Sequence, residues 1–331
     1  MRYVEFGEIR TSALGFGCGG VMGRVGRGDS LRAMGAAWEG GVRLFDTARS
    51  YGYGEAEGVL GEFLAGRRDE ATVVTKFGIL PSKPAAWKRL AKPVVRAGLR
   101  LVPSAREMVR RQIAGEMSAG HFDVATLRSS LEASLRALRM EYVDMLLMHE
   151  APVSVMGQED LIAELGKVVD EGKVRRMGVS MPRYVFAGMA LQLHPEVVWA
   201  AQFPAHLLEI PMDALSRMAQ PGPFVMGNHL FGGAEGAAMS SAALAGVASD
   251  TFVKESLREK LRGEPKQVLA QVSFDAAFVG AGAHVVVPSM LDVEHVRVNL
   301  MAAREVVFSR AEVKAVLKWM RGIRRTGRKP A

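Results

Sequence analysis

Short apolar runs alternate along this chain with longer stretches in which apolar residues recur every three or four positions. The short runs are typical of buried strands, and the longer stretches are typical of amphipathic helices. The predicted strands span 12–17, 42–45, 71–76, 142–148, 174–179, 197–202, 223–227 and 284–287. The predicted helices span 30–38, 56–65, 124–138, 159–171, 184–193, 211–219 and 265–279, followed by two late helices at 292–303 and 310–321.

This repeated alternation of strand and helix predicts an α/β fold, a (β/α)8 TIM barrel that forms a single domain over residues 1–331. A short hairpin is predicted over 2–12. A doubly wound sheet is the rival fold, and Gly15, Gly17 and Gly20 match the spacing of its dinucleotide fingerprint. However, no helix opens directly after these glycines, and no acid follows the second strand at the position that binds a ribose. The pattern therefore favours a closed barrel.

Three stretches interrupt the rhythm. Residues 80–122 form a long insertion after the third strand, and 322–331 form a basic tail. Residues 232–250 are rich in Gly, Ala and Ser, a composition that we expect to pack poorly and to form a mobile loop.

The net charge of +8 is unevenly spread, because the segment 83–116 holds nine basic and only two acidic residues. Apolar residues are interleaved with the basic ones, so the segment is either a solvated lid that packs on the barrel or a weak docking surface for an anionic substrate, a membrane or a protein. No groove-reading element suggests nucleic-acid binding.

The composition indicates the compartment in which we expect the protein to fold. The chain is 49% hydrophobic, which suffices for a sizeable core, and its single cysteine, Cys18, excludes an internal disulfide and suits a reducing cytoplasm. No leader pattern opens the sequence, and no charge-free apolar run reaches the roughly 20 residues of a membrane span. We expect a soluble, cytoplasmic protein of undetermined oligomeric state.

Four residues with complementary chemistry follow three of the predicted strands. Asp46 ends the second strand and Tyr51 lies in the loop after it, Lys76 ends the third strand, and His149 ends the strand over 142–148. The carboxyl ends of the strands of a parallel barrel meet on one face, where catalytic groups collect. These four residues are therefore the predicted catalytic set, with Tyr51 and His149 also touching the substrate.

Their chemistry is that of proton transfer to an oxygen. A tyrosine titrates near pH ~10. An ammonium about 4 Å away, at an effective dielectric of about 20, favours the phenolate by roughly 4 kcal/mol. We therefore expect Lys76 to lower the pKa of Tyr51 by about three pH units, which would make Tyr51 a usable general acid. Asp46 keeps Lys76 charged, and His149 orients the substrate oxygen.

The chain resembles the aldo-keto reductase superfamily. The resemblance rests on the stretch from Asp46 to Glu57, on Thr75-Lys76-Phe77-Gly78, on Leu147-Met148-His149, on Met177-Gly178-Val179-Ser180, and on the tail from Val287 to Asn299. It implies an NAD(P)H-dependent oxidoreductase that reduces an aldehyde, a ketone or a sugar carbonyl to an alcohol, or runs the reverse reaction. It also implies that the hairpin plugs the barrel bottom and that the 80–122 lid, through Trp87, shapes the substrate pocket.

The resemblance further implies which residues contact the coenzyme, with NADP(H) favoured over NAD(H). Ser180 and Gln202 match the family's carboxamide contacts, whereas Met181 replaces an asparagine and Asn228 replaces a stacking aromatic residue. The 232–250 loop is expected to fold over the pyrophosphate. The full predicted set is Asp46, Ser180, Met181, Gln202, Asn228, Leu230, Gly232, Pro288, Ser289, Met290, His295 and Asn299.

Two other classes of function stay open. The replaced carboxamide and stacking residues are consistent with a non-catalytic sensor or regulatory subunit that binds a nicotinamide nucleotide on the same barrel. A barrel lyase or isomerase that uses the tail as a phosphate site is the third class. No metal site is predicted, because His149-Glu150 lacks a second histidine at the spacing of a zinc protease.

Overall fold

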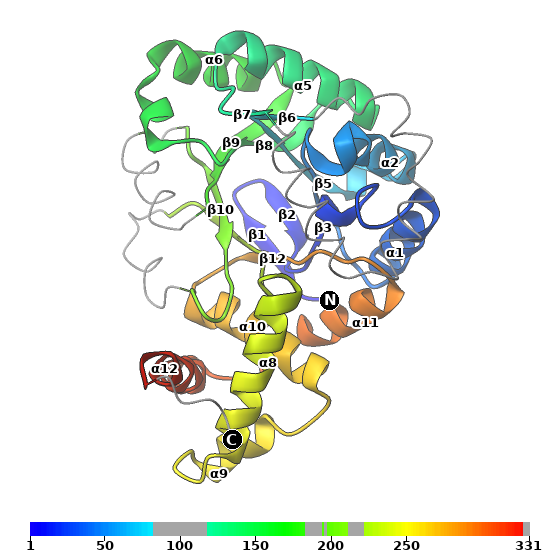
Figure 1. Cartoon of the computed structure of the whole chain (residues 1–331). Coiled ribbons are helices and arrows are strands. Elements are labelled where there is room, and N and C mark those ends of the chain that lie inside the picture. The colour runs from blue at the N-terminus through cyan, green and yellow to red at the C-terminus, as the bar shows by residue number, and fades with distance from the viewer. Residues whose placement is uncertain (82–117, 183–193, 195–196, 211–221, 327–331) are drawn as a thin grey trace.

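The computed structural model describes residues 1–81, 118–182, 194, 197–210 and 222–326. Within these ranges, eight parallel strands form one sheet whose spatial order is the chain order (Figure 1). The strands are β3 (Gly15–Gly17), β4 (Leu44–Asp46), β5 (Thr72–Phe77), β8 (Val143–His149), β9 (Val174–Ser180), β10 (Ala200–Pro204), β11 (Phe224–Asn228) and β12 (Val285–Val287). This order confirms the predicted (β/α)8 barrel.

The barrel is closed between its first and last strands. Isolated parallel bridges join Leu14 to Val286 and Gly17 to Ser289, and the amide of Gly17 donates to the carbonyl of Pro288 at 3.0 Å. A Cβ atom on Gly17 would lie 2.8 Å from that carbonyl oxygen, so the closure requires a glycine. Gly17 therefore serves the closure of the sheet, and the doubly wound alternative is wrong.

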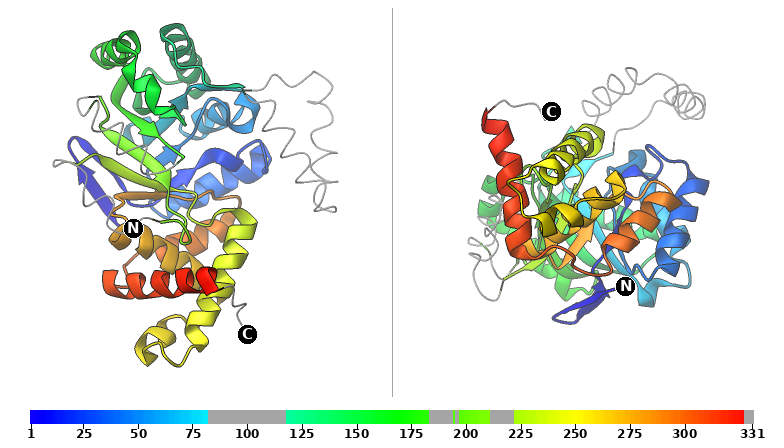
Figure 2. Two further views of the ribbon diagram at one scale, coloured as in Figure 1. Left: turned by 60° about the vertical axis from the view of Figure 1, so that its left-hand side comes forward. Right: turned by 90° about the horizontal axis from the view of Figure 1, so that it is seen from below.

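An N-terminal hairpin covers the amino end of the barrel, as the resemblance implied. Strands β1 (Tyr3–Phe6) and β2 (Ile9–Ser12) pair antiparallel (dark blue in Figures 1 and 2). Ile9, Val4 and Phe6 pack on the apolar cluster inside the barrel, and Phe6 meets the ring of Trp199 edge-on at 5.1 Å. The hairpin thereby covers the barrel interior at this end.

Helices surround the barrel, and a second and larger apolar core fills the space between them and the strands. They are α1 (Arg27–Glu39), α2 (Ala56–Phe63), α5 (Val124–Leu138), α6 (Glu159–Asp170), α10 (Pro265–Asp275), which continues as a π turn (η6, Ala276–Gly280), and α11 (Val293–Ala302). Short 3-10 turns occur at Cys18–Gly20 (η1), Tyr51–Gly54 (η2), Arg68–Glu70 (η3) and Val153–Gly157 (η4). Among the described residues, no helix combines the length and apolarity that a bilayer crossing requires.

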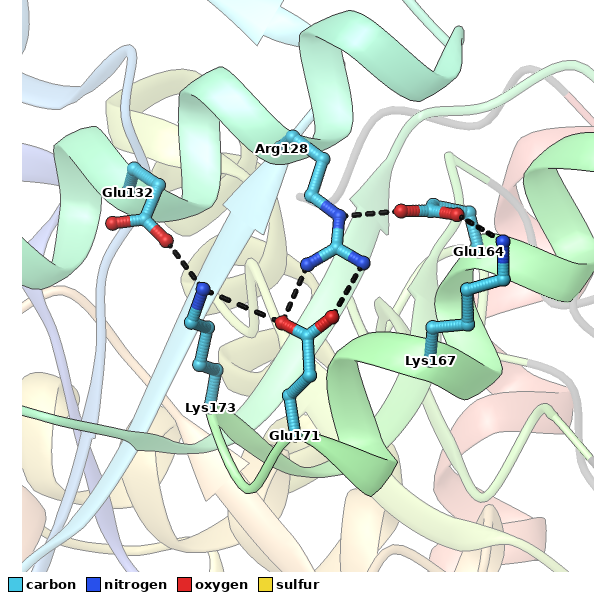
Figure 3. Close-up of polar contacts among 6 residues, drawn as sticks. All are labelled: Arg128, Glu132, Glu164, Lys167, Glu171 and Lys173. Carbon is cyan, nitrogen blue, oxygen red and sulfur yellow. Dashed lines mark hydrogen bonds and ion pairs between the residues drawn. The ribbon is translucent and has the colours of Figure 1, made fainter.

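Helices α5 and α6 are joined on the outer surface by a network of ion pairs (Figure 3). Arg128 of α5 bonds Glu164 of α6 and forms a two-pronged contact with Glu171, at 2.5 and 2.7 Å. Lys173, just before β9, contacts both Glu171 and Glu132. Such half-exposed pairs are screened by salt and stabilise a fold only modestly, so they fix the helices without building a site.

One sequence prediction about the backbone is wrong. The segment 232–250, expected to be a loop, forms helix α8 (Gly233–Ser249). Two further helices contact α8, namely α9 (Glu255–Lys260) and α12 (Arg310–Thr326). Alanine is the best helix former, so the composition that suggests a loop also supports a helix. Leu244 and Val247 are buried, and Gly246 leaves room for the ring of Trp319, because a Cβ there would lie 2.6 Å from it. Small residues thus let α12 pack closely on α8 (Figure 2).

Several predictions fall outside the described residues: the helices at 184–193 and 211–219, the basic segment 83–116, and Trp87. Of the 80–122 insertion, the structure describes the base, where β6 (Ile79–Leu80) pairs antiparallel with β7 (Ser118–Ala119).

Candidate active site

Alternation along the strands directs the predicted residues into the barrel mouth. Leu44, Val74 and Leu147 belong to the apolar cluster inside the barrel. Side chains two positions apart on a strand share a face, so the residues two positions later face the same way at the carboxyl ends. Those residues are Asp46, Lys76 and His149. The same step leads from Ala200 to Gln202 and from Met226 to Asn228.

The ammonium of Lys76 is the centre of the site. It donates to Oδ1 of Asp46 at 2.6 Å and to the backbone oxygen of Thr47 at 2.9 Å, and it lies 3.5 Å from the hydroxyl of Tyr51. These contacts use all three donors of an ammonium. Lys76 and Asp46 are 1% and 4% exposed, so the ion pair is shielded from water and screening is weak.

Tyr51 reaches this centre from the turn that follows β4. The turn is tight: Gly52 has φ +58°, and a Cβ there would lie 2.4 Å from the carbonyl oxygen of Val21. The ring of Tyr51 meets that of His149 edge-to-face, with centroids 5.9 Å apart. The structure therefore brings together all four residues that the sequence singled out, from three strands and one turn.

The protonation of these groups differs from the sequence-based expectation in one respect. Burial raises the pKa of Tyr51, and the nearby Lys76 lowers it only in part, so the phenol is less acidic than a free tyrosine. Burial lowers the pKa of Lys76, but attraction to Asp46 and Tyr51 outweighs it and the pKa is raised. The expected lowering of the Tyr51 pKa counted the ammonium and omitted desolvation, which works against the phenolate.

His149 is neutral over the physiological range. Burial, reinforced by the positive charge of Lys76 and by His229, lowers its pKa to about 3. A neutral imidazole carries one N–H donor, so His149 can still donate a hydrogen bond to an oxygen.

A second chain of hydrogen bonds reaches Asp46 from the other side of the mouth. Ser180 donates to Oε1 of Gln202 at 2.8 Å, and Nε2 of Gln202 donates to Oδ1 of Asp46 at 3.1 Å. Ser180 and Gln202, which were predicted to contact the nicotinamide carboxamide, therefore bond one another, and Gln202 also holds Asp46. Met181 is buried beside them, and its amide donates to the backbone oxygen of Gln202.

Several buried polar atoms near the mouth have no hydrogen-bond partner among the residues that the structure describes, and two of them lie at the ends of strands β8 and β11. These two are Nδ1 of His149 and Oδ1 of Asn228. Because an unsatisfied buried polar atom is costly, such atoms call for a ligand or water. Beyond Asn228, Leu230 is buried, and Gly232 has φ +63° and lies against His206 at the start of α8.

Five residues of the predicted coenzyme set lie in the segment after β12 and on α11. Pro288 and Met290 are buried and Ser289 is exposed. Asp292 caps α11 by accepting the amide of His295 at 2.8 Å, and Nδ1 of His295 lies 2.9 Å from the same carboxylate oxygen. Asn299 is buried one turn further on.

Two side chains at this helix start already have carboxylate partners. Arg297 pairs with Glu294 at 2.7 and 2.9 Å. Arg297 and His295 therefore each contact a carboxylate of the same helix.

The sequence-based prediction missed Glu57, which is buried without any exposed side-chain area. It accepts the hydroxyl of Thr75 at 2.7 Å and pairs with Arg49 at 3.2 Å. Its position contained a signal, because Glu57 lies three residues before Leu60 and so occupies the apolar face of the predicted helix. An acid on a buried face requires partners, and these partners lie next to the predicted catalytic residues.

A closed parallel barrel with a buried acid–base cluster at its carboxyl face defines a class of barrel enzymes. The model of the aldo/keto reductase family matches residues 13–202, more than half of the chain, and the chain belongs to that family. It is 29% identical over 192 residues, 56% of this chain and 46% of the relative, to a "Probable aldo-keto reductase 1" of Glycine max. It is 36% identical over 85 residues, 25% of each chain, to a "Pyridoxal 4-dehydrogenase" of Microbacterium luteolum. The chain thus spans about half the length, or less, of these curated relatives.

Solved structures share the fold. The holo form of an aldo-keto reductase from Bacillus halodurans is 18% identical with a TM-score of 0.66, and the match covers 96% of both chains. An aldo/keto reductase from Klebsiella pneumoniae, in complex with NADP and acetate, is 22% identical with a TM-score of 0.62, covering 96% of this chain and 94% of that one. At these identities the likeness shows the barrel fold.

Proposed function

We propose that this protein is an NAD(P)H-dependent oxidoreductase that reduces a carbonyl compound to an alcohol, or catalyses the reverse. The observation that carries the proposal is the buried contact chain from Asp46 through Lys76 to Tyr51, with His149 beside the phenol ring. Family membership supports it, and so do relatives named as a pyridoxal 4-dehydrogenase and a 6-dehydroglucose reductase.

The residues at the mouth fit a nicotinamide. Its carboxamide offers both a donor and an acceptor, and the mouth presents an unsatisfied acceptor on Asn228 together with the hydroxyl of Ser180 and the amide of Gln202. Any new bond to Gln202 would compete with its bond to Asp46. A nicotinamide coenzyme, when bound, supplies the hydride that the carbonyl carbon accepts.

The chain's own residues manage the proton. Tyr51 donates its phenolic proton to the carbonyl oxygen, and the resulting phenolate lies 3.5 Å from the ammonium of Lys76, which stabilises it. Asp46 and the backbone oxygen of Thr47 hold that ammonium in place. Neutral His149 donates a hydrogen bond to the same substrate oxygen. Because burial raises the pKa of Tyr51, the phenol is protonated at neutral pH and is ready to act as the acid.

Within this proposal, the coenzyme is NADP(H) in preference to NAD(H). The Klebsiella relative was solved with NADP, which supports the preference. A 2′-phosphate at the start of α11 would have to draw His295 and Arg297 away from Asp292 and Glu294. We therefore expect discrimination over NADH of about tenfold or less, a difference of about 1.4 kcal/mol. Dissociation constants for the two coenzymes, measured in parallel, test this expectation.

The proposed activity is tested by mixing the protein with NADPH, and separately NADH, and a panel of aldehydes, ketones and sugars. Loss of nicotinamide absorbance is followed, and coenzyme binding is measured independently. Steady consumption with at least one carbonyl is expected. Tight binding without turnover on any carbonyl would support the sensor or regulatory alternative, which the replacements at Met181 and Asn228 motivate. Failure to bind either coenzyme would favour a lyase or isomerase.

A further inference from the structure

Glu57 is a fully buried carboxylate that contacts none of the reacting groups. It lies in the first turn of α2, and its side chain has no exposed area. Burying an ionised carboxylate is costly unless it is paired and hydrogen-bonded. Both of its oxygens are used: Oε1 accepts the hydroxyl of Thr75 at 2.7 Å, and Oε2 lies 3.2 Å from a guanidinium nitrogen of Arg49.

The two partners of Glu57 belong to the two segments that carry the proposed acid and its cation. Thr75 directly precedes Lys76 on β5, and Arg49 lies two residues before Tyr51 in the turn after β4. Neighbouring residues on a strand point to opposite faces. Thr75 therefore faces α2 outside the barrel, whereas Lys76 faces the mouth. From outside the barrel, Glu57 therefore links the turn after β4, through Arg49, to strand β5, through Thr75.

Of the three contacts of the Lys76 ammonium, the one with the hydroxyl of Tyr51 is the longest. It is also the contact that Glu57 can affect through Arg49 and Thr75. The ammonium lies 2.6 Å from Asp46 and 2.9 Å from the oxygen of Thr47, but 3.5 Å from the hydroxyl of Tyr51. Tyr51 lies on a turn, whereas Lys76 lies on a strand bonded on both sides. A shift of the turn would lengthen this contact first.

We propose that Glu57 is a positioning residue that sets the separation of Tyr51 from Lys76 by clamping Arg49 to Thr75. The inference rests on the proposed function, in which that pair delivers the proton. Positioning is sensitive to distance, and a displacement of about 1 Å in a catalytic contact can reduce the rate by about 100-fold. Glu57 acts through this distance and leaves coenzyme binding to other residues.

The test compares kcat, the coenzyme dissociation constant and the melting temperature in three variants. Glu57→Ala removes both contacts and is expected to lower kcat by about 10- to 100-fold with little change in coenzyme affinity. Glu57→Gln keeps an oxygen for Thr75 but loses the acceptor for Arg49, and should recover only part of that loss. Thr75→Val removes only the hydroxyl, is expected to lower kcat by about threefold to tenfold, and carries the test if Glu57→Ala does not fold.

A matched control is Asp144, which lies on β8 and contacts the amino end of β5, the strand that carries Thr75 and Lys76. Asp144 is also a buried carboxylate paired with arginine and bonded to β5, through the amide of Val73 at 2.8 Å. Asp144→Asn should lower the melting temperature and leave kcat within about twofold of wild type. Equal losses of kcat in the Asp144 and Glu57 variants would reduce Glu57 to a structural role.

The decisive readout is a double-mutant cycle with Tyr51→Phe. If Glu57 acts by placing Tyr51, Glu57→Ala should change the residual rate of the Tyr51→Phe enzyme by no more than about twofold. A loss in that background as large as in wild type would overturn the positioning role. Absence of turnover by the wild-type protein on every carbonyl would instead overturn the proposed function, and the positioning role with it.

Discussion

Strands β5 and β8 are associated with a buried ion pair at each end, and the two pairs are built differently. At the amino end, Asp144 on β8 lies 2.9 Å from both Arg68 and Arg175. The guanidinium groups of both arginines lie over the ring of Tyr142, at 4.1 and 4.4 Å from its centroid. At the carboxyl end, Lys76 on β5 bonds Asp46 inside the barrel mouth.

The difference lies in what each cation can do. Arginine is always charged and presents a rigid fork of donors, so the Asp144 cluster is a fixed structural fastening. Lysine is a point charge, and Lys76 faces a phenol that can give up a proton. A buried ion pair can take part in chemistry when its cation contacts a group that is able to transfer a proton, as the ammonium of Lys76 contacts the hydroxyl of Tyr51.

The largest expected effect comes from Lys76→Met. At 3.5 Å and an effective dielectric of about 20, the ammonium favours a phenolate by about 5 kcal/mol, so its loss should lower kcat by about 10³-fold or more. Steady-state kinetics at saturating coenzyme measure this loss, with circular dichroism as the check on folding. A folded variant that keeps wild-type turnover would remove Lys76 from the mechanism.

Asp144→Asn should lower the stability of the fold and leave turnover nearly unchanged. It leaves two arginines without their carboxylate and should lower the free energy of unfolding by about 2 kcal/mol, less than for a fully buried pair because Arg175 is half exposed. Denaturant unfolding measures this change, and kcat of the folded variant should stay near wild type. A large loss of kcat without a loss of stability would erase the distinction between the two ends.

The pH dependence of the rate should report the protonation of the groups at the carboxyl end. Tyr51 and Lys76 have raised pKa values and His149 has a pKa of about 3, so the site keeps one protonation state through neutral pH. The rate of carbonyl reduction should be flat through neutral pH and should fall only at alkaline pH, where the phenol, whose pKa is raised by burial, loses its proton. An inflection near the ordinary histidine value would show that His149 titrates during catalysis.

His149 also predicts the sign of a stability change. Its folded-state pKa lies below the unfolded value, so below about pH 6.5 the unfolded chain binds more protons than the folded one. This contribution to stability is complete above that pH and is lost progressively as the pH falls toward about 3. Unfolding curves of wild type and His149→Gln, compared at pH 7 and 4.5, measure it, and equal losses in both proteins would contradict it.

The sequence predicted the fold and the four converging residues because both depend on local periodicity. Alternation along the strands decides which side chains face inward, so Asp46, Lys76 and His149 could be placed without coordinates. The resemblance supplied what periodicity could not, including the role of the hairpin.

The remaining features depend on neighbours that are distant in sequence. The direction of the Tyr51 pKa shift depends on how fully other segments bury the phenol. The partners of Glu57 and Asp144 likewise become visible only when strands and helices are assembled. Composition misled the prediction at α8, because an alanine-rich segment is compatible with a loop or a helix until Trp319 of α12 packs on it.

The most direct test of the central claim is the Tyr51→Phe variant, which removes one hydroxyl from the mouth and leaves the amino-end cluster intact. Carbonyl reduction is followed by loss of NADPH absorbance under saturating conditions, with coenzyme affinity measured on the same samples. The proton-donor role of Tyr51 predicts a loss in kcat of about 10³-fold with unchanged NADPH binding. Turnover within a few-fold of wild type would contradict it.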